Sequence, residues 1–115
     1  MQKTVFFAFR GDPLCFIHVL LNSLDLAARG LEGRIILEGE AINLVEKMAK
    51  PDHFLHQRYR QAKENNLFIG ACKACSTKLG AREAVESEGI ELTGSMSGHP
   101  AMADFIEQGY TILTF

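Results

Sequence analysis

The sequence contains no tryptophan, only three prolines and only three cysteines in 115 residues. An odd and low number of cysteines argues against the paired disulfide framework of a small secreted protein. In a reducing compartment, closely spaced cysteines are more often redox-active, reactive or metal-binding than structural. We therefore expect cysteine chemistry in this protein rather than cysteine cross-links.

The sequence also lacks a large excess of charge and any long apolar run. Its formal net charge is -2, and it has no basic stripe, so we predict no nucleic-acid partner. No segment approaches the roughly 18 consecutive apolar residues of a membrane span. The first apolar run, residues 5–9, is too short for the apolar region of a signal peptide. We expect a cytoplasmic protein with no membrane partner.

Five short apolar runs are typical of strands buried on both faces, because their apolar residues do not alternate with polar ones. The length predicts a single domain over residues 1–115. The predicted strands are residues 4–9, 34–38, 67–71, 90–93 and 110–115.

Helical segments are predicted between these strands. They are residues 13–29, two pieces within 40–66 separated by Pro51, residues 76–88, and a last helix that His99 and Pro100 open and that runs to residue 108. Asp12 before Pro13 is a helix-start signal. The alternation predicts a three-layer α/β/α fold in which helices cover both faces of a five-stranded parallel sheet. Segment 40–66 is long for one crossover and is also interpreted as a lid.

Cys72 and Cys75 form a CxxC directly after the third predicted strand. In an open parallel sheet, ligands and chemistry collect at this carboxyl edge. The positive end of the next helix favours a thiolate, and Lys73 and Lys78 are nearby in sequence. We therefore expect Cys72 to be a nucleophile with a lowered thiol pKa and Cys75 to assist it. The alternative is a pair of small cysteines packed under a loop.

Polar residues from other loops reach the same edge. They are Arg10 after the first strand, Glu38 and Glu40 after the second, and Ser95, Ser97 and His99 after the fourth. His99 is a candidate base or cationic partner for a thiolate, the alternative being an inert histidine near a helix start. Arg10, Ser95 and Ser97, together with the two lysines, are candidate substrate-binding residues. Since neither GxGxxG nor GxxxxGK[ST] is present, we predict no cofactor.

His53 and His56 form an HxxH pair, which with the CxxC would make a set of two cysteines and two histidines. The order is reversed from that of a zinc finger, and a parallel α/β core needs no metal to fold. The other interpretation is two exposed histidines on a charged helix. We predict no metal at these residues and keep the Cys₂His₂ set as an alternative.

Three features together resemble the DsrE/DsrF-like sulfur-relay family, which includes TusD-type subunits. They are residues 31–41 (LEGRIILEGEA), the spacing from Cys72 to Gly80, and the ending GYTILTF at 109–115. The resemblance spans almost the whole chain. It implies a five-stranded fold of Rossmann or flavodoxin type, a homo- or hetero-oligomer, and a persulfide carried on Cys72. We predict a homo-oligomer, either a trimer or a hexamer.

Two positions differ from the family pattern. Lys78 and Leu79 stand where DsrE and TusD have two arginines, and Cys75 is an additional cysteine. A persulfide on Cys72 can be attacked by Cys75, which releases sulfide and leaves a disulfide.

The resemblance thus implies a small sulfurtransferase-like carrier that accepts sulfane sulfur and passes it on or releases it, with a sulfur donor or acceptor protein as partner. Two alternatives stay open. One is a dithiol–disulfide redox protein, and the other is a non-enzymatic oligomeric or metal-binding module.

Overall fold

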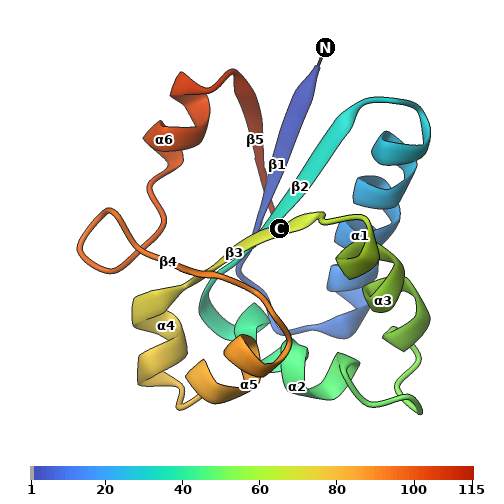
Figure 1. The fold of residues 1–115 in the computed structure, drawn as a ribbon, viewed down its shortest axis with the longest axis vertical. Coiled ribbons are helices and arrows are strands. Elements are labelled where there is room, and N and C mark those ends of the chain that lie inside the picture. The colour runs from blue at the N-terminus through green and yellow to red at the C-terminus, as the bar shows by residue number, and fades with distance from the viewer. Residues whose placement is uncertain (1) are drawn as a thin grey trace.

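A five-stranded, all-parallel sheet forms the centre of the computed structural model, which describes residues 2–115 (Figure 1). The strands are β1 (Lys3–Ala8), β2 (Glu32–Leu37), β3 (Phe68–Cys72), β4 (Leu92–Thr93) and β5 (Tyr110–Thr114). Their order across the sheet is β4-β3-β2-β1-β5, and every neighbouring pair is parallel. The predicted α/β fold is confirmed.

The helices lie between these strands. They are α1 (Pro13–Ala28), the 3-10 helix η1 (Gly39–Asn43), α2 (Leu44–Met48), α3 (His56–Glu64), α4 (Lys73–Lys78), α5 (Arg82–Ser87) and α6 (Met102–Glu107). Helix α1 begins as predicted, because the Asp12 carboxylate accepts a hydrogen bond from the Leu14 backbone N–H at 2.9 Å. None of the helices in the described residues is both long and apolar enough to cross a membrane.

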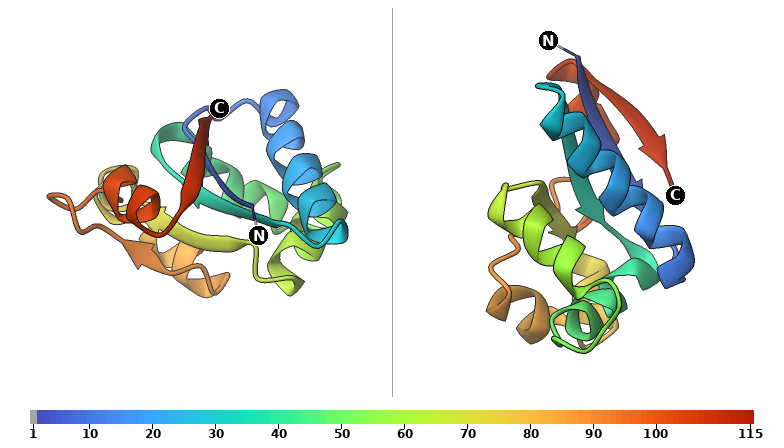
Figure 2. Two further views of the ribbon diagram at one scale, coloured as in Figure 1. Left: turned by 90° about the horizontal axis from the view of Figure 1, so that it is seen from above. Right: turned by 90° about the vertical axis from the view of Figure 1, so that its right-hand side faces the viewer.

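The two faces of the sheet are covered unequally. Figures 1 and 2 show α1 and α3 on one side of the strands and α6 on the other. Phe6 belongs to the large core on the α1 side, whereas its neighbour Phe7 belongs to a smaller cluster under α6. The Phe7 ring packs edge-on against Phe105 of α6, with ring centroids 5.6 Å apart. Burial on both faces explains why the strand sequences are continuously apolar.

The interpretation of segment 40–66 as a lid is wrong, because most of its apolar side chains are part of the core. Leu44, Val45, Met48 and Leu55 have no exposed surface, and Tyr59 is 1% exposed. Burying side chains of this size is a main source of folding free energy, so the segment cannot open without unfolding part of the protein.

The helix predicted over 76–88 is two short helices instead. Helix α4 begins earlier, at Lys73, because Cys72 is both the last residue of β3 and the N-cap of the helix. It ends before Gly80, whose φ of 69° lies in the left-handed region and breaks the helix. The last helix begins later than predicted, at Met102, because His99 pairs with Met96 in an antiparallel bridge.

Candidate functional site

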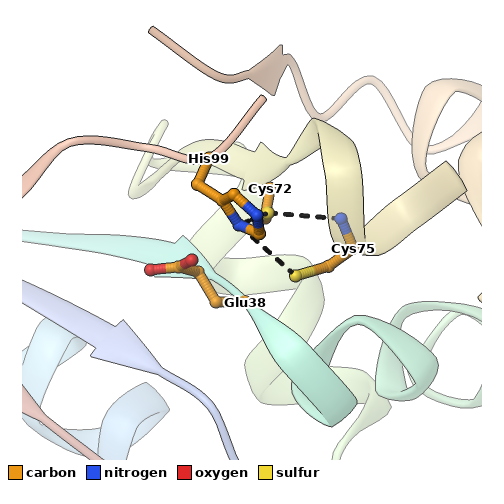
Figure 3. A group of neighbouring side chains, drawn as sticks. All are labelled: Glu38, Cys72, Cys75 and His99. Atoms are coloured by element: carbon orange, nitrogen blue, oxygen red, sulfur yellow. Dashed lines mark hydrogen bonds between the residues drawn. The ribbon is translucent and has the colours of Figure 1, made fainter. Parts of the chain in front are cut away.

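Four side chains meet at the carboxyl edge of the sheet: Glu38, Cys72, Cys75 and His99 (Figure 3). One oxygen, sulfur or nitrogen atom from each lies within 4.8 Å of those of the others. They come from three separate segments, namely the end of β2, the β3–α4 junction and the loop after β4. The parallel sheet brings these segments together because the carboxyl ends of its strands share one edge.

Cys72 lies at the junction of β3 and α4. Its residue is fully buried, and its Sγ accepts a hydrogen bond from the Cys75 backbone N–H at 3.3 Å. The Sγ also lies 3.7 Å from the carbonyl oxygen of Gly98. The sulfur is therefore held by the first turn of α4 and by the loop after β4.

His99 stands beside both thiols. Its Nδ1 atom is 3.2 Å from the Sγ of Cys72 and 4.0 Å from the Sγ of the half-buried Cys75. Figure 3 shows the imidazole ring over Cys72, with Glu38 and Cys75 on either side. Both cysteines are free thiols. One ring nitrogen is thus within reach of a proton on either sulfur.

The loop that carries His99 is closed by backbone hydrogen bonds. Met96 and His99 exchange two N–H to carbonyl bonds of 2.9 Å each, and the Gly98 carbonyl accepts the Ala74 N–H at 2.8 Å. A Cβ on Gly94 would lie only 2.5 Å from the carbonyl carbon of Gly98. Only glycine permits this approach, which lets the loop fold back on itself. The bond from Ala74 to Gly98 holds the loop to the start of α4.

Glu38 places a buried carboxyl group beside the thiols. It is 7% exposed, and its backbone N–H continues the sheet by donating to the Ala8 carbonyl at 2.8 Å. Burial raises the pKa of the Glu38 carboxyl, although the charge of His99 and a hydrogen bond from Cys72 act in the opposite direction. From the sequence we expected Glu38 near this edge but gave it no role, because its burial depends on how distant segments pack.

The expectation of a lowered thiol pKa at Cys72 is wrong. Burial raises the pKa of Cys72 to about 12, and the neighbouring Cys75 and the negative charge of Glu38 act in the same direction. The Cys75 N–H lowers it, but by less. Lys73 and Lys78 are exposed. Cys72 therefore rests as a thiol, and His99 is a base within reach of its proton.

The other predicted site residues are placed less centrally. Arg10 and Ser97 are exposed, and the Ser95 hydroxyl donates to the Asp104 carboxylate of α6 at 2.6 Å. Ser97 has a φ of 52°, as expected for a tight turn. Of these loop residues, His99 therefore lies beside the cysteines, and Ser95 holds the loop after β4 to α6.

Two clefts approach the four-residue cluster. The first has a volume of about 370 Å³ and is lined by Phe9, Glu38, Met96, His99 and residues 100–103. The second has a volume of about 210 Å³ and is lined by Gly39, Glu40, Cys75, Lys78 and Leu79. Glu38 and His99 are therefore reached from one side and Cys75 from the other, where Lys78 adds a positive charge.

The proposed set of two cysteines and two histidines is not formed. His53 Nδ1 accepts a hydrogen bond from the Leu55 N–H at 3.1 Å, and His56 Nδ1 lies 2.8 Å from the Met48 carbonyl, to which it can donate. Both histidines fasten the segment between α2 and α3. Neither belongs to the group that contains Cys72 and Cys75.

Comparison with protein families matches the model of the DsrE/DsrF-like family to residues 3–115. The uncharacterized protein MJ0733 of Methanocaldococcus jannaschii is 28% identical over 97 residues, which are 84% of this chain and 77% of that protein. An uncharacterized protein of Archaeoglobus fulgidus is 35% identical over 49 residues, which are 43% of this chain and 80% of that protein.

Solved structures share the fold. The conserved protein of unknown function BT1422 from Bacteroides thetaiotaomicron superimposes with a TM-score of 0.73 at 18% identity, over 98% of this chain and 95% of that one. The ychN protein from E. coli superimposes with a TM-score of 0.64 at 18% identity, over the full length of both chains. At this identity the likeness concerns the arrangement of helices and strands alone.

Proposed function

Because the chain belongs to the DsrE/DsrF-like family, which matches residues 3–115, we propose that it accepts sulfane sulfur as a persulfide on Cys72 and passes it on or releases it. The observation that carries this proposal is the 3.2 Å separation between Cys72 Sγ and His99 Nδ1. A thiol beside a base at the carboxyl edge of a parallel sheet is the arrangement that a sulfur acceptor needs.

Loading begins with transfer of the Cys72 thiol proton to His99. The thiolate then attacks the outer sulfur of a donor persulfide, and the sulfur–sulfur bond of the donor breaks. The donor leaves as a thiolate that takes up the proton, and Cys72 is left as the persulfide. One persulfide and one thiol thus become another persulfide and thiol, so the step needs no external oxidant or reductant.

Release can follow through Cys75. Its thiolate attacks the inner sulfur of the Cys72 persulfide, a disulfide forms between the two cysteines, and hydrogen sulfide departs with the remaining proton. The Sγ atoms belong to one group of ligand atoms that all lie within 4.8 Å of one another, so only a small movement joins them. A dithiol reductant then restores both thiols. When Cys75 does not attack the persulfide, the outer sulfur passes to an acceptor protein.

The proximity of the two thiols also favours a second candidate function, a dithiol–disulfide redox protein. The same pair would then cycle between thiols and disulfide without carrying sulfur. The two functions differ in their intermediate, because the sulfur cycle passes through a persulfide that adds one sulfur atom, whereas the redox cycle adds none. Both cycles can end in the same disulfide. Either cycle places the protein in a reducing compartment, and we propose the cytoplasm.

We also propose that the protein is a homo-oligomer, with a second copy of the chain covering α6 and the free edge of β5. Ile106 of α6 is 61% exposed and Leu113 of β5 is 45% exposed, and covering such side chains is favourable. Analytical ultracentrifugation should show a trimer or hexamer that Ile106→Glu dissociates. The exposed Leu14 of α1 gives the control Leu14→Glu, and a monomeric native protein would contradict the assembly.

The sulfur proposal is tested by intact mass spectrometry after incubation with a small-molecule persulfide donor. Cys75→Ser, in which no second thiol can attack the persulfide, should gain one sulfur atom, and Cys72→Ser should gain none. The native protein should gain one sulfur atom at first and lose it again as the disulfide forms. Cys15→Ser, which changes a half-buried cysteine of α1, is the matched control and should load like the native protein. Loading of Cys72→Ser would overturn the assignment, and loss of two hydrogens in the native protein with no gain of sulfur in Cys75→Ser would support the redox function.

A further inference from the structure

We propose that Glu38, Cys72, Cys75 and His99 also form a binding site for a zinc-type divalent metal ion. Within residues 2–115, these side chains are the only group in which three or more potential ligands converge. The metal site goes beyond the proposed sulfur chemistry and does not rest on it. Metal binding requires donor atoms from all three segments, whereas sulfur loading requires one reactive sulfur.

The donor atoms suit zinc. Two thiolates, one imidazole and one carboxylate are all ligands that Zn²⁺ takes in tetrahedral sites. Thiolate ligands disfavour the hard ions Mg²⁺ and Ca²⁺, which prefer oxygen ligands. Imidazole nitrogen is also a ligand that suits zinc. A cysteine pair spaced as CxxC with a histidine from a second loop therefore points to a borderline-soft ion.

The distances between the donor atoms are close to those of a metal site. With bonds of about 2.3 Å to sulfur and 2.0–2.1 Å to nitrogen, a tetrahedral ion separates sulfur from nitrogen by about 3.6 Å. The two sulfur–nitrogen distances here are 3.2 Å for Cys72 and 4.0 Å for Cys75, which bracket this value. Small changes in side-chain torsions therefore suffice to centre an ion among the four ligands.

The backbone already holds each ligand in place. Glu38 is fixed by the sheet through its bond to Ala8, and His99 is fixed by its paired bonds to Met96. The Cys75 N–H that donates to Cys72 Sγ at 3.3 Å would continue to stabilise that sulfur as a thiolate ligand. Such supporting hydrogen bonds orient metal ligands and strengthen binding.

An ion can reach the site through the cleft of about 370 Å³ that Glu38 and His99 line. Once bound, it would be shielded by Cys72, which is fully buried, and by Glu38, which is 7% exposed. Cys75 and His99 are half-buried. The site therefore combines an entry path with a largely dry interior, as a metal centre requires.

A bound ion would compete with sulfur loading, because a metal-bound Cys72 thiolate cannot attack a persulfide. Zinc-loaded protein should therefore gain no sulfur until a chelator removes the ion. This consequence rests on the proposed function, whereas metal binding itself does not. If the protein binds metal but the metal-free protein does not load sulfur, the metal site stands and only the sulfur chemistry is contradicted.

Cobalt titration of the reduced, chelator-treated full chain tests the site. Co²⁺ should bind with one ion per chain and produce a thiolate-to-cobalt charge-transfer band together with the intense visible bands of tetrahedral cobalt. Added Zn²⁺ should bleach these bands by displacing the cobalt. Weak octahedral bands alone, or no binding, would overturn the proposal.

Variants show whether the four named residues are the ligands. Cys75→Ser should lower the charge-transfer intensity per bound cobalt to about half, because one of the two thiolate ligands is lost, and His99→Ala and Glu38→Gln should each weaken binding by at least about tenfold. Cys15→Ser and His53→Asn are matched controls on other segments and should keep one tetrahedral cobalt per chain. Circular dichroism shows that each variant is folded, and a tetrahedral thiolate spectrum that survives in a folded Cys72→Ser/Cys75→Ser variant would place the ion elsewhere.

Discussion

The Sγ of Cys72 lies 3.2 Å from Nδ1 of His99, although 27 positions separate the two residues in sequence. The contact joins the end of β3 to the loop after β4, which are neighbouring strands in the sheet. It pairs a buried thiol, whose pKa is raised to about 12, with a nitrogen able to accept its proton. We therefore expect the reactivity of Cys72 to depend on His99 rather than on a thiolate that is present at rest.

Replacing His99 with asparagine should slow sulfur loading of Cys72 by about 100-fold or more, because positioned proton transfer contributes that much to a reaction rate. The rate is measured as mass gain over time at pH 7. His53→Asn is the control, since His53 hydrogen-bonds to the backbone of Leu55, away from the thiols. Equal loading rates in His99→Asn and the native protein would remove His99 from the mechanism.

Alkylation of Cys72 by iodoacetamide should be slow at pH 7 and should rise continuously with pH up to about 12, where the pKa of its thiol lies. Only the thiolate reacts, and a raised pKa keeps the thiolate fraction small at neutral pH. A reaction rate that already levels off near pH 7 would mean that the thiol pKa is lowered instead.

Removing the carboxylate of Glu38 should make Cys72 more reactive. The negative charge of Glu38 contributes to the raised pKa of Cys72, so Glu38→Gln should lower that pKa and speed alkylation at a given pH. The neighbouring Glu40 is exposed, and Glu40→Gln is the matched control that should alkylate at the native rate. A slower reaction in Glu38→Gln would show that the carboxylate acts mainly by holding the site together.

Cys75→Ser should lengthen the lifetime of the persulfide on Cys72, because no second thiol remains to attack its inner sulfur. Hydrogen sulfide release after loading measures this directly and should fall, while the initial rate of sulfur loading stays the same. If the variant releases sulfide as fast as the native protein, an external thiol rather than Cys75 resolves the persulfide.

Gly94→Ala should displace the loop that carries His99, since the added Cβ would lie 2.5 Å from the Gly98 backbone. We expect a loss of about 1–3 kcal/mol in the free energy of unfolding together with slower loading. Gly30→Ala is the control, because Gly30 has a φ of 77° and no neighbour within 4 Å of the added Cβ. It should cost about 1–2 kcal/mol of stability and leave loading unchanged, so loading lost equally in both variants would mean that stability alone is responsible.

The strands and the position of Cys72 could be predicted because both follow from local pattern. Continuous apolar runs indicate strands buried on two faces, and a cysteine after such a run falls at the carboxyl edge. The sequence contains signals for the break at Gly80 and for the burial of Leu44 and Tyr59. They are a glycine and an apolar periodicity, and the predictions gave them too little weight.

The role of Glu38 and the sign of the Cys72 pKa shift could not be predicted in the same way. Both depend on desolvation, which depends in turn on the packing of β2, β3 and the loop after β4. A helix N-terminus favours a thiolate, but the hydrogen bond from the Cys75 backbone N–H lowers the pKa of Cys72 by less than burial raises it. A local sequence pattern does not show which of these two opposing contributions to the pKa of Cys72 is larger.

The most direct test of the account is to find which cysteine carries the sulfur. Trypsin cleaves after Lys63, Lys73 and Lys78, so Cys72 falls in the peptide 64–73 and Cys75 in the peptide 74–78. After brief loading of the native protein and immediate alkylation, which traps the persulfide before Cys75 attacks it, we predict that the extra sulfur atom is found on the peptide 64–73. Sulfur found only on the Cys75 or Cys15 peptide, or on none, would contradict the assignment of Cys72 as the sulfur carrier.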